Sequence, residues 1–106
     1  MSFQGMIFFV TVPNLELGEK IATGLVEKKI AACANIIKGI TSIYKWKGKI
    51  EKDEECLLII KTSSKKVNDI KEFIEENHTY EVPECIGVRI EDGLEKYLNW
   101  IEESMV

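Results

Sequence analysis

Apolar runs alternate along this chain with stretches in which apolar and charged positions recur at helical spacing. The first run, residues 6–12, is β-branched and aromatic, which is typical of a strand covered on both faces. It ends just before Asn14, a residue suited to cap a helix. Leu17, Ile21 and Leu25 then share one face of an amphipathic pattern, so a helix is predicted there.

A long hairpin is predicted next. Residues 33–37 and the piece that runs from residue 40 to Trp46 are strand-like, and Gly39 between them indicates a bulge or bend. Gly48 marks the turn, and an acidic stretch leads from it into the apolar run 56–60. Hairpin arms of roughly 15 residues exceed the usual strand length of about 5–6, so the tips should overhang and pair with a neighbour.

The remainder predicts a helix, a strand and a second helix. Ser63 or Ser64 caps the first of these helices. Its apolar stripe consists of Val67, Ile70, Phe73 and Ile74. Residues 85–90 predict the fourth strand, and residues 94–105 predict a short C-terminal helix. The residues expected to face inward from that last helix are Tyr97, Leu98 and Ile101.

This order predicts a single α+β domain over residues 1–106 with the ferredoxin-like β-α-β-β-α-β arrangement and a C-terminal helix. Right-handed crossovers place both inner helices on one face of the sheet. The strands are apolar on both sides, so the other face must also be covered. Self-association is the simplest way to cover it.

Composition and charge narrow the function classes. The net charge is −4, Arg89 is the only arginine, and the run 56–60 lacks stacking aromatics, so nucleic acid is not an expected partner. No apolar run is long enough to span a bilayer, and no signal peptide is recognised, so we expect a cytoplasmic protein. The balance of charged residues, rich in Lys and Glu, is typical of thermophilic proteins.

The three cysteines are widely spaced, without a C-x-x-C motif. A disulfide framework or a zinc cage within the chain is therefore not expected. Cys56 and Cys85 lie in predicted strands and are interpreted as core residues.

The connection from residue 77 to residue 84 is the richest segment in chemistry. It contains the only histidine, His78, together with Tyr80, Glu81 and Glu84. A helix-to-strand connection needs only a few residues, and this one is longer. Rigid elements on both sides would position these side chains, which is typical of a functional loop.

Three elements together resemble one known family. They are Ala-Ala-Cys-x-Asn at residues 31–35, Tyr-x-Trp-x-Gly at residues 44–48, and His-x-Tyr-Glu-x-Pro at residues 78–83. In this order and spacing they resemble the CutA family, named for divalent-cation tolerance, from about Ile7 to Trp100. The resemblance implies a cytoplasmic homotrimer of ferredoxin-like subunits, associated with copper or another divalent cation. It implies no organic cofactor and no established reaction.

Two residues are candidate metal ligands. His78 matches the histidine of the family motif, and imidazole is a common ligand of transition metals. Cys33 matches the family cysteine, and a thiolate suits Cu(I). The alternative for His78 is a structural histidine whose ring nitrogens are satisfied by backbone groups. The alternative for Cys33 is a small buried residue in a strand. Some family members carry a cysteine and a second histidine linked to copper binding where this chain has Val10 and Asn77.

A second group of residues suggests a ligand pocket. Lys61 is a charge on an otherwise buried strand, and with Tyr80 and Glu81 it could line a pocket for a small anion or metabolite. The alternative is an ion pair between Lys61 and Glu81 or Glu84 at a subunit contact. Trp46, on the hairpin, belongs either to a subunit interface or to the pocket lining.

These features support two functions. The first is a trimeric protein of divalent-cation tolerance that binds metal ions between subunits. The second is a small-molecule sensing or signalling trimer similar in architecture to PII proteins. An enzyme with Cys33 as nucleophile and His78 as base lacks a visible orienting group and an oxyanion loop, so the chain is not expected to be an enzyme.

Overall fold

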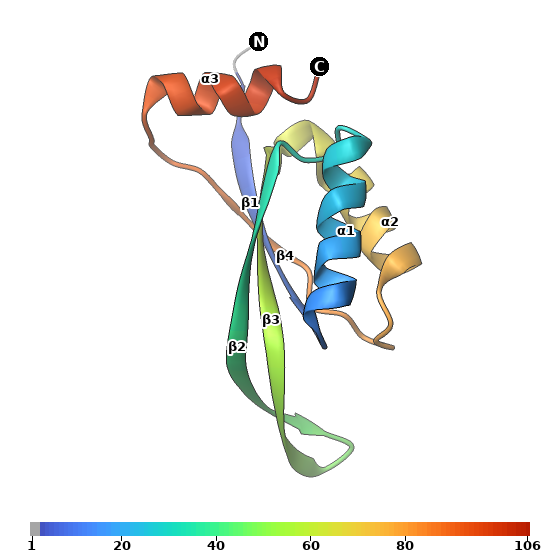
Figure 1. The fold of residues 1–106 in the computed structure, drawn as a ribbon. Coiled ribbons are helices and arrows are strands. Elements are labelled where there is room, and N and C mark those ends of the chain that lie inside the picture. Colours follow the sequence, from blue (N-terminus) through green and yellow to red (C-terminus); the bar gives the residue numbers. More distant parts are fainter. Residues whose placement is uncertain (1–2) are drawn as a thin grey trace.

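A computed structural model describes residues 3–106 as a four-stranded antiparallel sheet in the order β2-β3-β1-β4. Met1 and Ser2, the first residues of the predicted domain, lie outside the described residues. The helices α1 and α2 lie side by side on one face of the sheet, and α3 crosses its end (Figure 1). The element order confirms the predicted ferredoxin-like α+β fold with a C-terminal helix.

The first half follows the predicted pattern closely. Strand β1 spans Gly5–Val12 and helix α1 spans Leu15–Glu27. The Asn14 side chain accepts a hydrogen bond of 2.8 Å from the Leu17 backbone N–H, which satisfies one of the free donors at the start of the helix. The core between sheet and helices is formed by Phe8, Val10, Val12, Ile21, Leu25, Leu58, Ile60, Ile70 and Ile74.

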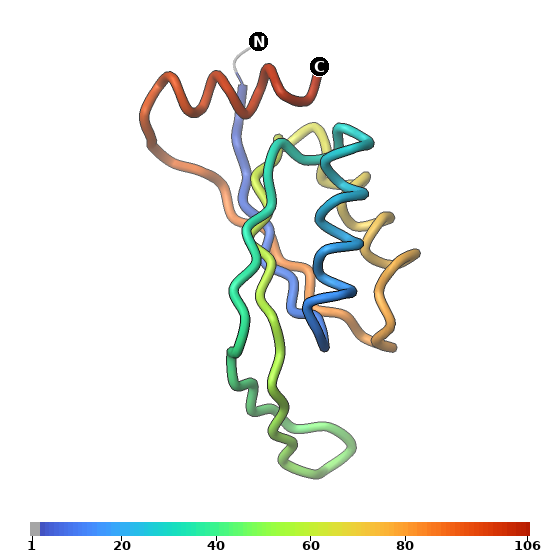
Figure 2. The backbone as a smooth tube through the Cα atoms, in the orientation of Figure 1, coloured from blue at the N-terminus to red at the C-terminus, as the bar shows by residue number. Residues whose placement is uncertain are grey.

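The long hairpin is also present. Strand β2 spans Cys33–Trp46 and strand β3 spans Lys49–Ser63, so the acidic stretch belongs to the strand and does not merely precede it. The register shifts between Ile37 and Ile40, around Gly39 with its φ of +72°, as expected of a bulge. The hairpin extends well beyond the other strands (Figure 2), and the molecule measures 47 × 25 × 22 Å.

The second half differs in detail from the prediction. Ser63 caps a short 3₁₀ turn, Ser64–Lys66, and α2 follows over Val67–Asn77. Strand β4 is only Ile86–Arg89, and α3 spans Glu95–Glu103. Of the three residues expected to face inward, Ile101 is fully buried and Leu98 is partly buried, whereas Tyr97 lies beside Cys33 of β2 and remains 43% exposed. No helix among residues 3–106 is both long and apolar enough to cross a membrane.

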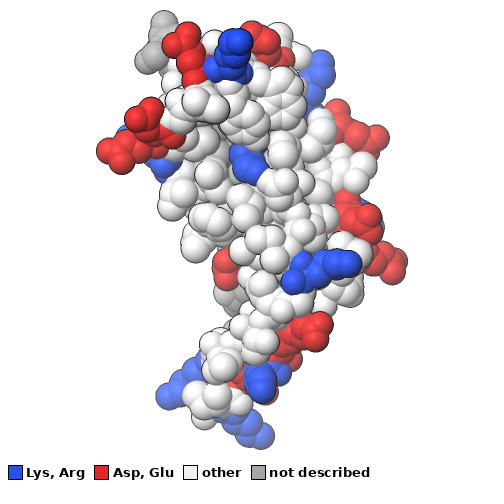
Figure 3. All heavy atoms as spheres, turned by 60° about the vertical axis from the view of Figure 1, so that its left-hand side comes forward, with Lys and Arg blue, Asp and Glu red and all other residues white. Residues whose placement is uncertain are grey.

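The sheet face opposite α1 and α2 is uncovered by those helices. We call it the bare sheet face. Strand pairing aligns on it Ile7, Phe9, Ile37, Leu57, Ile59, Ile86 and Val88. Ile86 is 59% exposed and Val88 is 47% exposed. Figure 3 shows this side of the molecule as a broad expanse of mostly uncharged side chains with most charges near its rim.

Candidate functional site

His78 is the C-cap residue of α2, and both of its ring nitrogens contact backbone groups. The Nε2 atom lies 2.7 Å from the Thr11 carbonyl oxygen, and the Tyr80 backbone N–H lies 3.1 Å from Nδ1. A carbonyl oxygen only accepts, so Nε2 carries the proton and Nδ1 accepts from Tyr80. This geometry matches the alternative in which backbone groups satisfy His78 and its role is structural, because neither nitrogen has a free lone pair for a metal.

Tyr80 connects the loop to the hairpin. Its ring centroid lies 4.7 Å from that of His78, and its hydroxyl donates a hydrogen bond of 2.6 Å to Glu55 of β3. Glu55 is only 6% exposed. Burial, followed by this hydrogen bond, raises the pKa of Tyr80 well above its ordinary value. The phenol therefore stays protonated and remains a donor at neutral pH.

A cleft of about 630 Å³ lies between this loop and the hairpin. We call it the hairpin cleft. Its lining residues are Thr11, Ser42, Ile43, Tyr44, Trp46, Glu55, Thr79, Tyr80, Glu81, Val82 and Glu84. The Tyr44 hydroxyl donates to Asp53, and this hydrogen bond is the main cause that raises the pKa of Tyr44 to about 12. Burial, then the charge of Glu55, raises the pKa of Glu84.

The hairpin cleft brings together three of the four residues predicted to form a ligand pocket. Trp46, Tyr80 and Glu81 all line it. Lys61 is not among its lining residues: it pairs with Cys33 and Ile7 in the sheet, and its ammonium donates to Asn35. The expectation that Lys61 shares a pocket with Tyr80 and Glu81 is therefore wrong within one chain.

Sequence reasoning missed Glu55 as a member of this site. The signal was available, because Glu55 belongs to an acidic stretch that directly precedes the buried run 56–60. Continuing the strand backward by one residue would have placed that carboxylate on the same side of the sheet as Leu57. The register confirms that Glu55 belongs to the strand, since it pairs with Ile40 just past the bulge.

Cys33 lies at the start of β2, partly buried and directly opposite Lys61. Its neighbour on α3 is Tyr97, whose pKa is raised first by burial and then by the thiol. Cys56 is buried in the core as predicted. Cys85 just precedes β4 and is only partly buried, although it packs against the same core; burial is the main cause that raises its pKa.

The two predicted metal ligands lie apart. Cys33 aligns with Ile7 near one end of the sheet, whereas His78 contacts Thr11 near the other. The step from Ile7 to Thr11 corresponds to roughly 13 Å along a strand. Across residues 3–106, no three His, Cys, Asp or Glu side chains come together in a way that could hold a metal ion. Within this described part of one chain, the donors are therefore isolated and form no complete metal site.

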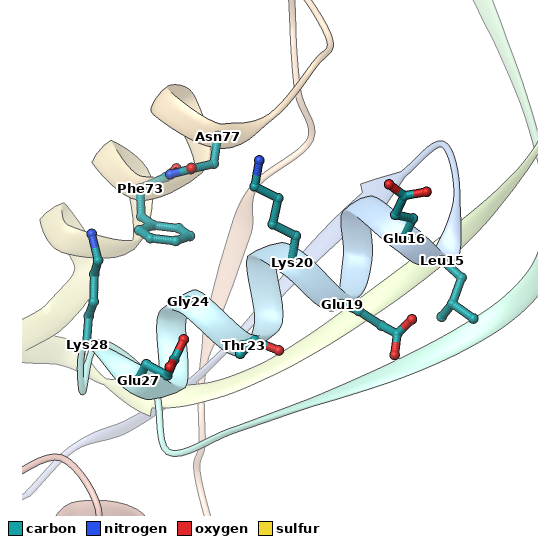
Figure 4. Close-up of a pocket in the computed structure, with 10 residues that line it drawn as sticks. All are labelled: Leu15, Glu16, Glu19, Lys20, Thr23, Gly24, Glu27, Lys28, Phe73 and Asn77. Atoms are coloured by element: carbon teal, nitrogen blue, oxygen red, sulfur yellow. The ribbon is translucent and has the colours of Figure 1, made fainter.

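A second hollow lies between α1 and α2 (Figure 4) and has a volume of about 790 Å³. Its most notable contact is between the Lys28 ammonium and the Phe73 ring, 5.5 Å from the ring centroid. Figure 4 shows Glu19 and Thr23 pointing away from α2, so the lining side chains do not converge on one point. The hollow is larger than the hairpin cleft, but it contains none of the predicted site residues.

Comparison with known proteins places this geometry in context. Residues 6–104 match the family model described as CutA1 divalent ion tolerance protein. The chain is 41% identical to the divalent-cation tolerance protein CutA of Thermus thermophilus, over 92% of this chain and 95% of that protein. It is 46% identical to the chloroplastic protein CutA of Arabidopsis thaliana, over 93% of this chain but 54% of that protein. The chain spans about half the length of that plant relative and of the mouse protein CutA.

Solved structures agree closely with the fold. The divalent cation tolerance protein from Thermus thermophilus has a TM-score of 0.92 at 40% identity and covers 94% of this chain and 97% of its own. The CutA1 structure from Oryza sativa has a TM-score of 0.93 at 44% identity, covering 95% and 93%. Agreement over nearly the whole of each chain extends to the overhanging hairpin as well as the sheet.

Proposed function

This chain belongs to the CutA1 divalent ion tolerance family, and on that premise we propose that it serves divalent-cation tolerance as a homotrimer that binds metal ions between its subunits. The observation that carries the proposal is the bare sheet face. Apolar side chains such as Val88, 47% exposed, and Ile86, 59% exposed, would stay in contact with water in a lone subunit. Contiguous exposed apolar surface of this kind marks an interaction site.

The position of the metal donors supports binding between subunits. Cys33 lies on the bare sheet face, in register with Ile7 and Lys61. Assembly through this face would bring donors from different copies together, whereas the described residues of one chain do not cluster into a metal-binding group. A thiolate suits soft ions such as Cu(I), whereas His78 would have to give up its hydrogen bond from Tyr80 to bind a metal.

Calorimetric titration of the assembled protein with Cu(I), Cu(II) and Zn(II) tests this proposal. We expect saturable Cu(I) binding in the wild type and weaker binding in Cys33→Ser. Cys85→Ser is the matched control, because it removes another partly buried thiol that packs against the helix-covered core and not on the bare sheet face. Binding no tighter than that of the denatured chain would contradict the proposal.

A non-catalytic role is part of the proposal. An enzyme that uses Cys33 as nucleophile and His78 as base would need the two groups within hydrogen-bond reach. In this chain they lie near opposite ends of the sheet, and both nitrogens of His78 already contact backbone groups. Relatives are likewise named for tolerance and not for a reaction.

Cytoplasmic location stays a prediction. The names of the relatives assign more than one compartment: the Arabidopsis protein is called chloroplastic, and the Archaeoglobus fulgidus structure is called periplasmic. Those words describe those proteins. Cell fractionation with an antibody against this chain would test its own location.

The second candidate function is a small-molecule sensor, and the hairpin cleft favours it. A cleft of about 630 Å³ falls within the range of roughly 300–1,000 Å³ typical of small-molecule sites. Aromatic and polar side chains line it together. A thermal-shift screen with metabolites of different charge tests this candidate, because a ligand that binds the folded state raises the unfolding temperature.

A further inference from the structure

The hairpin cleft is acidic and aromatic. Its carboxylates are Glu55, Glu81 and Glu84, and its aromatic side chains are Tyr44, Trp46 and Tyr80. None of the described residues that line it is basic. A small anion would therefore find no basic partner among these lining residues, contrary to the ligand that the sequence suggested.

Glu55 shows where a cation would be held. Glu55 is only 6% exposed, lines the cleft and accepts a hydrogen bond from the neutral Tyr80 hydroxyl. A buried carboxylate is costly unless a cation or several donors compensate its charge. The raised pKa of Glu84, caused by burial and then by Glu55, is a further sign of uncompensated negative charge in the cleft.

The shape of the cleft favours an organic cation over a metal ion. Within residues 3–106 the carboxylates do not converge into a metal-binding group. A volume of about 630 Å³ suits a molecule of several heavy atoms. Aromatic faces attract ammonium and guanidinium groups, and the Lys47 ammonium already lies 5.8 Å from the centroid of the Trp46 ring.

We propose that the hairpin cleft binds a small organic cation with an ammonium or guanidinium group, which pairs with Glu55 and packs against Trp46 and Tyr44. The inference rests on the second candidate function, because it names the class of ligand that such a sensor would take. The Tyr80 hydroxyl holds the Glu55 carboxylate in place and leaves its other oxygen for the ligand.

Agmatine, which has a guanidinium at one end and an ammonium at the other, is a suitable probe. We expect it to raise the unfolding temperature of the full chain and to bind saturably in calorimetry, whereas succinate does neither. Glu55→Gln should weaken agmatine binding at least tenfold. Glu54→Gln is the matched control, because it removes the same charge from the adjacent, exposed position of β3 and should bind like the wild type.

A second variant keeps the test decisive if Glu55→Gln fails to fold. Glu81 is exposed, so Glu81→Gln should fold normally and weaken agmatine binding several-fold. Equal affinity of Glu55→Gln and Glu54→Gln would overturn the inference. A second result would also overturn the inference: agmatine does not bind the wild type, and Glu55→Gln dissociates the assembly. In that case a side chain from a second copy would fill the cleft.

The thermal-shift screen with metabolites of different charge separates the organic-cation site from the sensor function. A response to an anionic or neutral metabolite, with none to agmatine, would overturn the organic-cation site and leave the sensor standing. A flat response to every class would contradict both.

Discussion

His78 joins two parts of the chain through two hydrogen bonds to backbone groups, one to the end of β1 and one within its own loop. His78→Ala removes both, and each lost bond leaves a backbone group without its partner. We expect a loss of about 1–3 kcal/mol in the free energy of unfolding, measured by urea denaturation at matched protein concentration. Thr79→Ala, an exposed neighbouring change, is the control. Identical midpoints for the two variants would contradict a structural role for His78.

Tyr80 should make stability dependent on alkaline pH. A free phenol ionises near pH 10, whereas burial and Glu55 raise the pKa of Tyr80 in the folded state. The stability that this difference provides is complete below about pH 10 and is lost as the pH rises through the higher folded pKa.

Tyr80→Phe should therefore flatten the fall in unfolding temperature above about pH 10. It should also lower stability at neutral pH by about 1–3 kcal/mol, because Glu55 loses its donor. Tyr44→Phe, at a 42% exposed position, should change both quantities less. A wild-type alkaline slope that survives in Tyr80→Phe would contradict this assignment.

At the residue scale, the sequence indicated which side chains could carry chemistry better than it indicated which of them lie next to one another. His78, Tyr80, Glu81 and Trp46 stood out because they are rare or sit in an unusually long loop. Lys61 was assigned to the same pocket because a charge on a buried strand needs a partner. Which partner it finds depends on strand register, and the register places Lys61 beside Cys33, with Asn35 as its hydrogen-bond acceptor.

At the scale of elements, Asn14 determines where α1 begins. Asn14→Ala removes the hydrogen bond to the Leu17 N–H and should cost about 1 kcal/mol. Asn14→Ser keeps a capping oxygen and should lie close to the wild type. Denaturant unfolding monitored by circular dichroism measures both variants, and equal stability of the two would show that the cap contributes nothing.

The elements themselves follow largely from local patterns. Asn14 and the apolar periodicity after it give α1, and Gly39 and Gly48 give the bulge and the turn of the hairpin. Strand β3 is longer than its apolar run, because outside the core the acidic residues still pair with β2. The predicted hairpin arms of roughly 15 residues already implied this overhang, and β2 and β3 confirm it with 14 and 15 residues.

At the scale of the whole molecule, the proposed trimer depends on assembly through the bare sheet face. Val88→Lys places a charge on that face at a position already 47% exposed, so the subunit should still fold. We expect this variant to dissociate into monomers with an intact circular dichroism spectrum. Val26→Lys, at a 42% exposed position on α1, is the control and should assemble like the wild type. Equal masses for the two variants would contradict the assignment of the interface.

The bare sheet face was predicted from the sequence and is visible in the structure of one chain. Two-sided apolar strands predicted an uncovered face, and the structure shows it across β1 to β4. The predicted count of three copies comes from the resemblance to the family.

The mass of the wild-type protein in solution is the direct test of the proposed trimer. Size-exclusion chromatography with multi-angle light scattering at micromolar concentration should give three times the 12.1 kDa of one chain. A mass of 12.1 kDa would contradict the account, because the bare sheet face would then be stable in water and the metal donors would remain apart.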